Sequence, residues 1–69
     1  MSAPNAVAEL YAASANFWDK ESASVRESIL LACGYDLAQA LDLSKIGFGA
    51  LNTWAQRAIV RLIGDKLQA

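Results

Sequence analysis

The residue types that most often perform catalysis are scarce in this chain of 69 residues. It contains no histidine and a single cysteine, Cys33, so a thiolate nucleophile would lack the imidazole base that usually activates it. The sequence around Cys33 is largely aliphatic, and we therefore expect a buried and unreactive thiol. One thiol without histidine also offers no plausible zinc site and no intramolecular disulfide.

The other polar residues form no recognisable catalytic set either. The carboxylates are not paired at a spacing typical of general acid–base catalysis. Gly47 and Gly49 lack the rest of a phosphate-binding loop. We therefore expect a protein that is not an enzyme and that has no catalytic residue, no metal and no cofactor. Its function must then depend on binding, and hence on the surfaces that its secondary structure builds.

The apolar pattern predicts an all-α fold in a single domain over residues 1–69. Large apolar residues recur at helical spacing over roughly 4–19 and again from Leu51 to about Leu67. Ser24 and Glu27 match a capping box, which predicts a second helix with Ser24 as its N-cap. The final helix carries so wide an apolar stripe that other helices or a second chain must cover it.

The region 25–43 allows two interpretations. In one, a single helix runs through Gly34, at a cost of about 1 kcal/mol relative to Ala. Asp36 then falls within the apolar stripe, where an unpaired charge is unfavourable. In the other, the helix stops before Gly34, which takes a left-handed conformation. Asp36 and Gln39 then form a capping box for a short helix to Leu43. The break is slightly favoured, so we expect three to four helices.

The small size of the chain predicts self-association. A chain of 69 residues buries a limited core and has marginal stability. Small domains gain stability from disulfides, metals or a partner chain, and only the last of these fits this composition. We therefore expect a helical homodimer, assembled mainly through the apolar stripe of the final helix. The predicted dimer contacts are Trp54, Ile59, Leu62, Ile63 and Leu67.

Residues 37–54 resemble the helix-turn-helix of phage repressors. Ala38 is the small residue early in the first helix, and the residues that would lock the two helices are Leu37, Leu41, Leu43, Phe48 and Leu51. Asp42 departs from the pattern, because that position usually holds glycine. The expected recognition helix would also present mostly Ile, Gly and Ala, which cannot hydrogen-bond to base edges. With a pI near 5.0, the chain is poorly suited to phosphates, so DNA-binding regulation is the alternative function.

Charge is unevenly distributed along the chain. Residues 1–44 carry six acids and two bases, a net charge of −4, whereas residues 45–69 carry four bases and one acid, a net charge of +3. Several apolar residues fall outside the expected core stripes or lie close to acids, as interface anchors do. The predicted partner contacts are Leu31, Tyr35, Asp36, Phe48 and Trp18. An acidic surface with such anchors suits a basic partner, such as the DNA-binding surface of a transcription regulator.

The compact, cysteine-poor, helical organisation of the whole chain resembles the small early host-takeover proteins of Mu-like Pseudomonas phages. Among these, it is most similar to the anti-activators of quorum sensing. The resemblance concerns length and organisation, and no individual residue is carried over. It implies a protein that binds the DNA-binding domain of a host quorum-sensing regulator, blocks its DNA binding, and also binds a pilus-assembly ATPase.

The sequence shows no signal-peptide pattern and no apolar run long enough to cross a bilayer. We therefore expect a cytoplasmic protein, located in the host cytoplasm if a phage encodes it, with no membrane partner.

Overall fold

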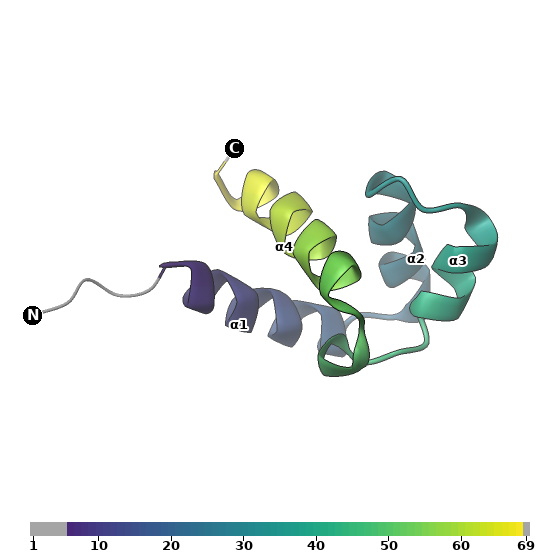
Figure 1. The fold of residues 1–69 in the computed structure, drawn as a ribbon, viewed down its shortest axis with the longest axis horizontal. Coiled ribbons are helices and arrows are strands. Elements are labelled where there is room, and N and C mark those ends of the chain that lie inside the picture. Colours follow the sequence, from purple (N-terminus) through teal and green to yellow (C-terminus); the bar gives the residue numbers. More distant parts are fainter. Residues whose placement is uncertain (1–5, 69) are drawn as a thin grey trace, which may run out of the picture.

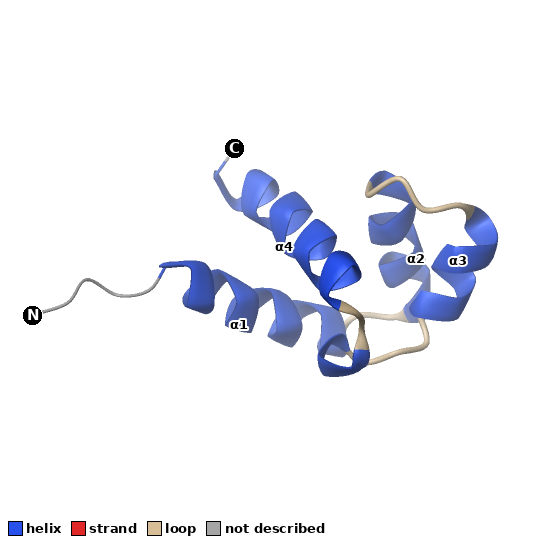
Figure 2. Cartoon of the chain, viewed as in Figure 1, coloured by secondary structure: helices blue, strands red, loops and turns tan. Residues whose placement is uncertain are grey.

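The computed structural model describes residues 6–68, with side chains placed for residues 6–66, and this range contains α-helices and no strand (Figures 1 and 2). The helices are α1 (Ala6–Lys20), α2 (Ala23–Ala32), α3 (Leu37–Leu43) and α4 (Thr53–Gln68), with a short 3₁₀ helix, η1 (Phe48–Ala50), between α3 and α4. The predicted all-α fold is confirmed, with the higher of the two expected helix numbers.

The helices form two pairs. In one pair, α1 and α4 run roughly antiparallel and pack against each other (Figure 1). In the other, α2 and α3 pack together as a helical hairpin, and α2 also packs against α4. The 3₁₀ helix η1 lies against α1. Because α2 contacts both α3 and α4, it connects the two pairs.

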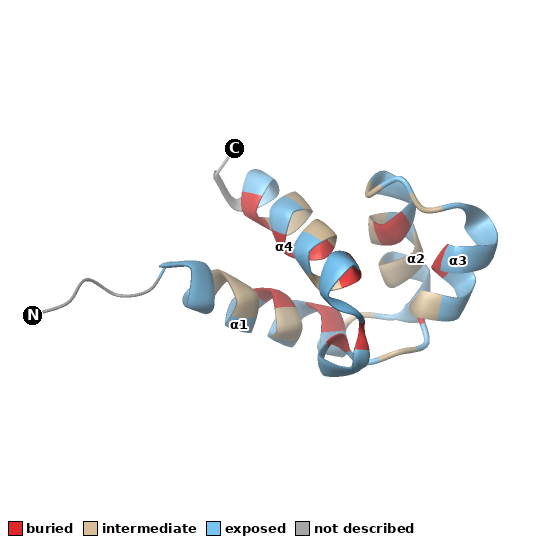
Figure 3. Ribbon diagram, in the orientation of Figure 1, coloured by how far each residue is buried: buried red, intermediate tan, exposed pale blue. Residues whose placement is uncertain are grey.

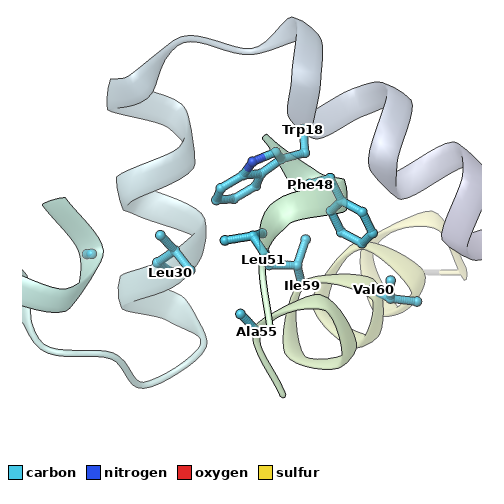
Figure 4. Packing of buried hydrophobic residues seen from close by; sticks show 8 residues of the cluster. Trp18, Leu30, Phe48, Leu51, Ala55, Ile59 and Val60 are labelled. Carbon is cyan, nitrogen blue, oxygen red and sulfur yellow. The ribbon is translucent and has the colours of Figure 1, made fainter. Parts of the chain in front are cut away.

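A small core joins these elements. Trp18, Leu30 and Ile59 are completely buried and come from α1, α2 and α4. Figure 4 shows Trp18 and Leu30 pointing toward Leu51, which precedes α4. The buried apolar residues of the described chain are Trp18, Leu30, Ala40, Phe48, Leu51, Ala55, Ile59 and Val60. A core of this size leaves many other apolar side chains only partly covered.

The start of α2 differs from the prediction. Ser22 is the N-cap, with an extended backbone and a hydroxyl that accepts a hydrogen bond from the Val25 amide at 3.3 Å. Ser24 lies inside the first turn, so the predicted capping box of Ser24 and Glu27 is wrong. An earlier start places Arg26 in the first turn of α2, from where its side chain reaches back to the end of α1.

The region 25–43 forms two helices, as the slightly favoured interpretation predicts. Gly34 separates them with a φ of 101°, a conformation that side chains disfavour. The Gln39 amide donates a hydrogen bond to the Asp36 carboxylate at 2.8 Å, and the Asp36 amide donates to the Gln39 side-chain oxygen at 3.3 Å. This capping box starts α3 and keeps the Asp36 carboxylate out of the core.

The recognition helix expected from the helix-turn-helix resemblance at 37–54 is absent. Residues 44–47 form a turn, η1 is only three residues long, and α4 does not begin until Thr53. Gly47 has an extended backbone, which interrupts helical continuation. Leu37 and Leu41, two of the expected locking residues, are 59% and 42% exposed and therefore lock nothing in the core.

The final helix matches its predicted apolar stripe in part. Ala55 and Ile59 are completely buried, whereas Trp54 is 76% exposed. The Ala55 amide donates to the Asn52 side-chain oxygen at 2.9 Å, so Asn52 caps the helix and Leu51 is buried just ahead of it. The helix therefore begins two residues later than predicted.

The side chain of Arg26, which belongs to α2, forms hydrogen bonds with the C-terminal ends of α1 and α3. Its guanidinium donates hydrogen bonds to the carbonyls of Trp18 at 2.9 Å, Asp19 at 3.2 Å and Ser44 at 2.9 Å. These carbonyls lie at the C-terminal ends of α1 and α3, where helix carbonyls lack intrahelical partners and carry partial negative charge. The guanidinium also lies over the Trp18 ring, 5.4 Å from its centroid.

The end of α1 also holds the segment that leads into α4. The Trp18 indole N–H donates to the Ile46 carbonyl at 2.9 Å, and the Phe48 amide donates to the Asp19 carboxylate at 2.9 Å. The Gln56 side-chain amide donates to the Phe48 carbonyl at 2.9 Å. Three hydrogen bonds with residues of α1 and α4 thus hold the segment 46–48, which has little regular structure of its own.

We expect Arg26→Lys to lower the free energy of unfolding by about 2 kcal/mol, because an ammonium group cannot present a planar fork of donors to three carbonyls. Urea denaturation followed by far-UV circular dichroism measures this change. Arg57→Lys is the matched control, since Arg57 lies on the exposed side of α4 and should change stability by less than about 0.5 kcal/mol. Equal losses in both variants would contradict the role assigned to Arg26.

Gly34 and Gly49 offer a second matched pair. A Cβ added at either position would meet no atom within 4 Å, but only Gly34 has a positive φ. We expect Gly34→Ala to cost about 1–2 kcal/mol of stability, because an L-residue is strained in that conformation. Gly49→Ala should be neutral or stabilising by up to about 1 kcal/mol. The same denaturation experiment compares them, and a harmless Gly34→Ala would refute the left-handed turn.

Candidate functional site

The described side chains offer little for covalent or metal chemistry. Cys33 is half-buried after the last turn of α2, and this burial raises the pKa of its thiol. A raised pKa leaves less of the nucleophilic thiolate at neutral pH. Within residues 6–66, no group of three or more His, Cys, Asp or Glu side chains is placed to hold a metal ion. The candidate functional features are therefore surfaces.

Several large apolar side chains are exposed on the described part of the chain. Among the described residues, those more than about a third exposed are Val7, Phe17, Val25, Leu31, Leu37, Leu41 and Trp54. Most of them fall in three places: on α2 and α3, in a groove between α1, α2 and α4, and on the outer side of α4. Exposed apolar clusters of this kind often mark interaction sites.

The first surface lies on α2 and α3 and combines leucines with acids. Leu31, Leu37 and Leu41 are 45%, 59% and 42% exposed. Asp36 and Asp42 are exposed beside Leu37 and Leu41 in the sequence, and Figure 3 shows that most of α3 faces solvent. We call these five residues the acidic leucine face.

The charge of this face is negative because α2 and α3 contain more acids than bases. Between residues 23 and 43, Arg26 is the only basic residue, and Glu27, Asp36 and Asp42 are the acids. The Arg26 guanidinium is engaged with three backbone carbonyls. The charge presented to solvent by α2 and α3 is therefore dominated by carboxylates.

The second surface is a concave one, which we call the apolar groove. It has a volume of about 440 Å³ and lies between α1, α2 and α4. Its lining residues are Ala13, Phe17, Val25, Ile29, Leu62, Ile63 and Lys66. Lys66 is the one charged residue in this lining, so an occupant would meet apolar walls and a single positive charge.

The third surface, which we call the tryptophan stripe, follows the outer side of α4. Trp54 is 76% exposed, and the Arg57 guanidinium lies 5.8 Å from the centroid of its ring. Arg61 lies one helical turn further on. Together with Tyr11, these residues line a shallow hollow of about 470 Å³. Within the described part of the chain, neither arginine forms an ion pair, so this stripe is basic as well as aromatic.

The structure changes the set of predicted partner contacts. Trp18 and Phe48 are 0% and 4% exposed, because the segment after α3 folds onto the end of α1 and buries both rings. They are core residues, and their prediction as partner contacts is withdrawn. Leu31 and Asp36 are exposed, and Tyr35 is half-buried against the core. These three remain predictions.

Sequence reasoning missed the binding potential of Leu37 and Leu41. It treated them as the lock of a helix-turn-helix, although they stand at i and i+4 of a short helix. A signal was available: Ala40 and Ser44, also at i and i+4, are small enough for the side of α3 that packs closely inward. The two leucines lie together next to that side and are left exposed.

The residues predicted as dimer contacts do not lie on one common surface. Ile59 is completely buried within the chain, so it cannot contact a second copy, and this prediction is corrected. Leu62 and Ile63 line the apolar groove, and Trp54 lies on the tryptophan stripe. The side chain of Leu67 lies outside the described residues. The dimer itself stays a prediction.

Comparison of the chain with protein-family models, with curated proteins and with solved structures found no match. The described residues also contain no helix with the length and apolarity needed to cross a membrane. The exposed surfaces are therefore the features from which we infer a function.

The half-buried Cys33 gives a prediction about pH. We expect its alkylation by iodoacetamide to be slower in the folded chain than in urea-unfolded chain at neutral pH. Burial raises the thiol pKa in the folded state, so the rise of the alkylation rate with pH should be displaced to higher pH. Mass spectrometry of the alkylated product against time measures both rates. Faster alkylation of the folded chain would contradict the description of Cys33 as an inert thiol.

Proposed function

We propose that this protein is a non-enzymatic inhibitor that binds a basic surface of another protein through the acidic leucine face. The observation that carries the proposal is the combination of three exposed leucines with an excess of exposed carboxylates over bases on α2 and α3. The proposed partner surface is the DNA-binding surface of a host transcription activator, with a quorum-sensing regulator as the first candidate. We also propose that the chain self-associates as a homodimer.

The two kinds of side chain have different roles in this proposal. Full burial of an exposed leucine contributes about 1.5–3 kcal/mol, so three leucines that are already about half covered supply several kcal/mol of binding free energy. Surface carboxylates contribute less to affinity, but they speed encounter with a basic surface and fix the orientation of binding. The leucines thus supply most of the binding free energy, and the carboxylates favour a basic partner.

The same charges explain how binding would inhibit. A DNA-binding surface is basic because it neutralises phosphates, and that contact dominates its affinity for DNA. Asp36 and Asp42 would occupy basic groups that otherwise contact phosphates, so the regulator cannot hold this protein and DNA at the same place. Direct DNA binding by this chain is not proposed, because the expected recognition helix is absent.

A competition experiment tests this proposal. A purified quorum-sensing regulator is bound to a fluorescent operator duplex, and the DNA is followed by anisotropy as this protein is added. We expect release of the DNA, with Leu37→Ser and Asp42→Lys each raising the half-maximal concentration about tenfold, equivalent to 1.4 kcal/mol. Val7→Ser is the matched control, because Val7 is 64% exposed but lies on α1, away from this face.

Circular dichroism checks that each variant keeps its helix content. The proposal fails if the regulator keeps its DNA at every concentration of this protein. The assignment to α2 and α3 fails if Val7→Ser weakens inhibition as much as Leu37→Ser does. A shift of free duplex DNA by this protein alone would instead support the alternative of DNA binding.

A further inference from the structure

We infer that the apolar groove is the docking site for a second copy of this chain, and that it receives Leu37 and Leu41 of that copy's α3. The groove is concave and needs a convex apolar occupant. The chain itself presents such an occupant on α3, so that both halves of the contact are present in one molecule.

The shapes of the two surfaces correspond. Leu37 and Leu41 stand one helical turn apart, about 5–6 Å between their Cβ atoms, and both project from a short helix that is mostly exposed. The groove, with walls from three helices and a volume of about 440 Å³, has room for two adjacent leucine side chains. Phe17 and Val25 in its walls are themselves partly exposed and would be covered by the same contact.

Charge distinguishes α3 from the other large apolar projection, Trp54. Lys66 is the charged residue of the groove lining. Trp54 lies beside Arg57, so its insertion would bring two cationic side chains together. Leu37 and Leu41 instead stand beside two exposed acids, Asp36 and Asp42, against one exposed base, Lys45, which follows the helix. Opposite charges at the edge of the contact favour α3, whereas like charges disfavour α4.

Val7 and Leu31, the other exposed aliphatic residues outside the groove, do not form a ridge like that of Leu37 and Leu41. Val7 is 64% exposed, but Leu10 and Tyr11, one turn further along α1, pack against the core. Leu31 is 45% exposed, but Tyr35, four residues further on, also packs against the core. A single side chain would fill only part of the groove. Leu37 and Leu41 are the exposed aliphatic pair with one-turn spacing in the described chain.

A consequence follows for the acidic leucine face, and this step alone rests on the proposed function. The leucines that enter the groove of a second copy are two of the three proposed to hold the partner protein. Self-association would therefore hide the partner-binding face, and partner and second copy would compete for it. The self-association itself is independent of any partner and can be tested without one.

A complementation experiment tests the contact. Sedimentation velocity from micromolar to submillimolar concentration compares Phe17→Ser, which alters the groove, with Leu37→Ser, which alters the ridge. We expect the natural chain to associate and each variant alone to be monomeric. An equimolar mixture should associate again, because the variants together contain one intact ridge and one intact groove. Trp54→Ala is the control and should associate like the natural chain.

Several outcomes would overturn the inference. A natural chain that stays monomeric to submillimolar concentration excludes it, and so does a mixture that stays monomeric. Dissociation of Trp54→Ala to the same degree as Phe17→Ser would place the contact on the tryptophan stripe instead. Circular dichroism of each variant separates loss of association from loss of folding.

A charge exchange provides a second test with exposed residues that leave the core intact. Lys66→Glu and Asp42→Lys should each weaken association at low salt, and the double variant should recover much of the lost affinity. A double variant as weak as either single variant would refute the assigned orientation.

In the DNA-release experiment, the Phe17→Ser variant should still release DNA from the regulator, because its acidic leucine face is intact. Failure of the regulator to respond at all would affect the proposed function but leave the complementation result standing.

Discussion

The arrangement of the helices depends on one partly buried charged group, the guanidinium of Arg26. It donates hydrogen bonds to carbonyls at the ends of α1 and α3 while remaining part of α2, so three helices meet at one side chain. Carbonyls at helix ends need donors, and a guanidinium can serve several of them at once. The same contact has an effect on the outside of the molecule. It engages the only basic side chain of α2 and α3, so the exposed charges of these two helices are carboxylates.

The amount of exposed apolar surface follows from the lengths of the helices. With only seven residues, α3 can bury little more than the side that contains Ala40 and Ser44. Leu37 and Leu41, which lie together on one flank of that side, have no further element to cover them. The groove arises in a similar way, because α1, α2 and α4 pack around a core of few side chains and leave Phe17 and Val25 at its edge. Short chains bury a smaller fraction of their surface, and here the uncovered remainder is concentrated in particular places.

Those parts of the fold that neighbouring residues determine were predictable from the sequence. Gly34 and the capping box of Asp36 and Gln39 involve residues within a few positions of one another, and they form as expected. Trp18 and Phe48 were misassigned because their burial depends on hydrogen bonds between residues 28 and 29 positions apart. Ser22 was overlooked as an N-cap for a related reason. The start of α2 is favoured by the reach of Arg26 to α1, which no local pattern contains.

The positions of ridge and groove also bear on the kind of assembly that they can form. A contact between two different surfaces either closes into a ring or continues as a chain of copies. In this fold both surfaces involve α2, since Val25 and Ile29 form part of the groove while α3 packs directly against the same helix. Ridge and groove therefore lie on elements that both pack against α2. Two copies related by a two-fold axis could exchange ridges, and such a closed dimer would leave no ridge or groove free for continued growth.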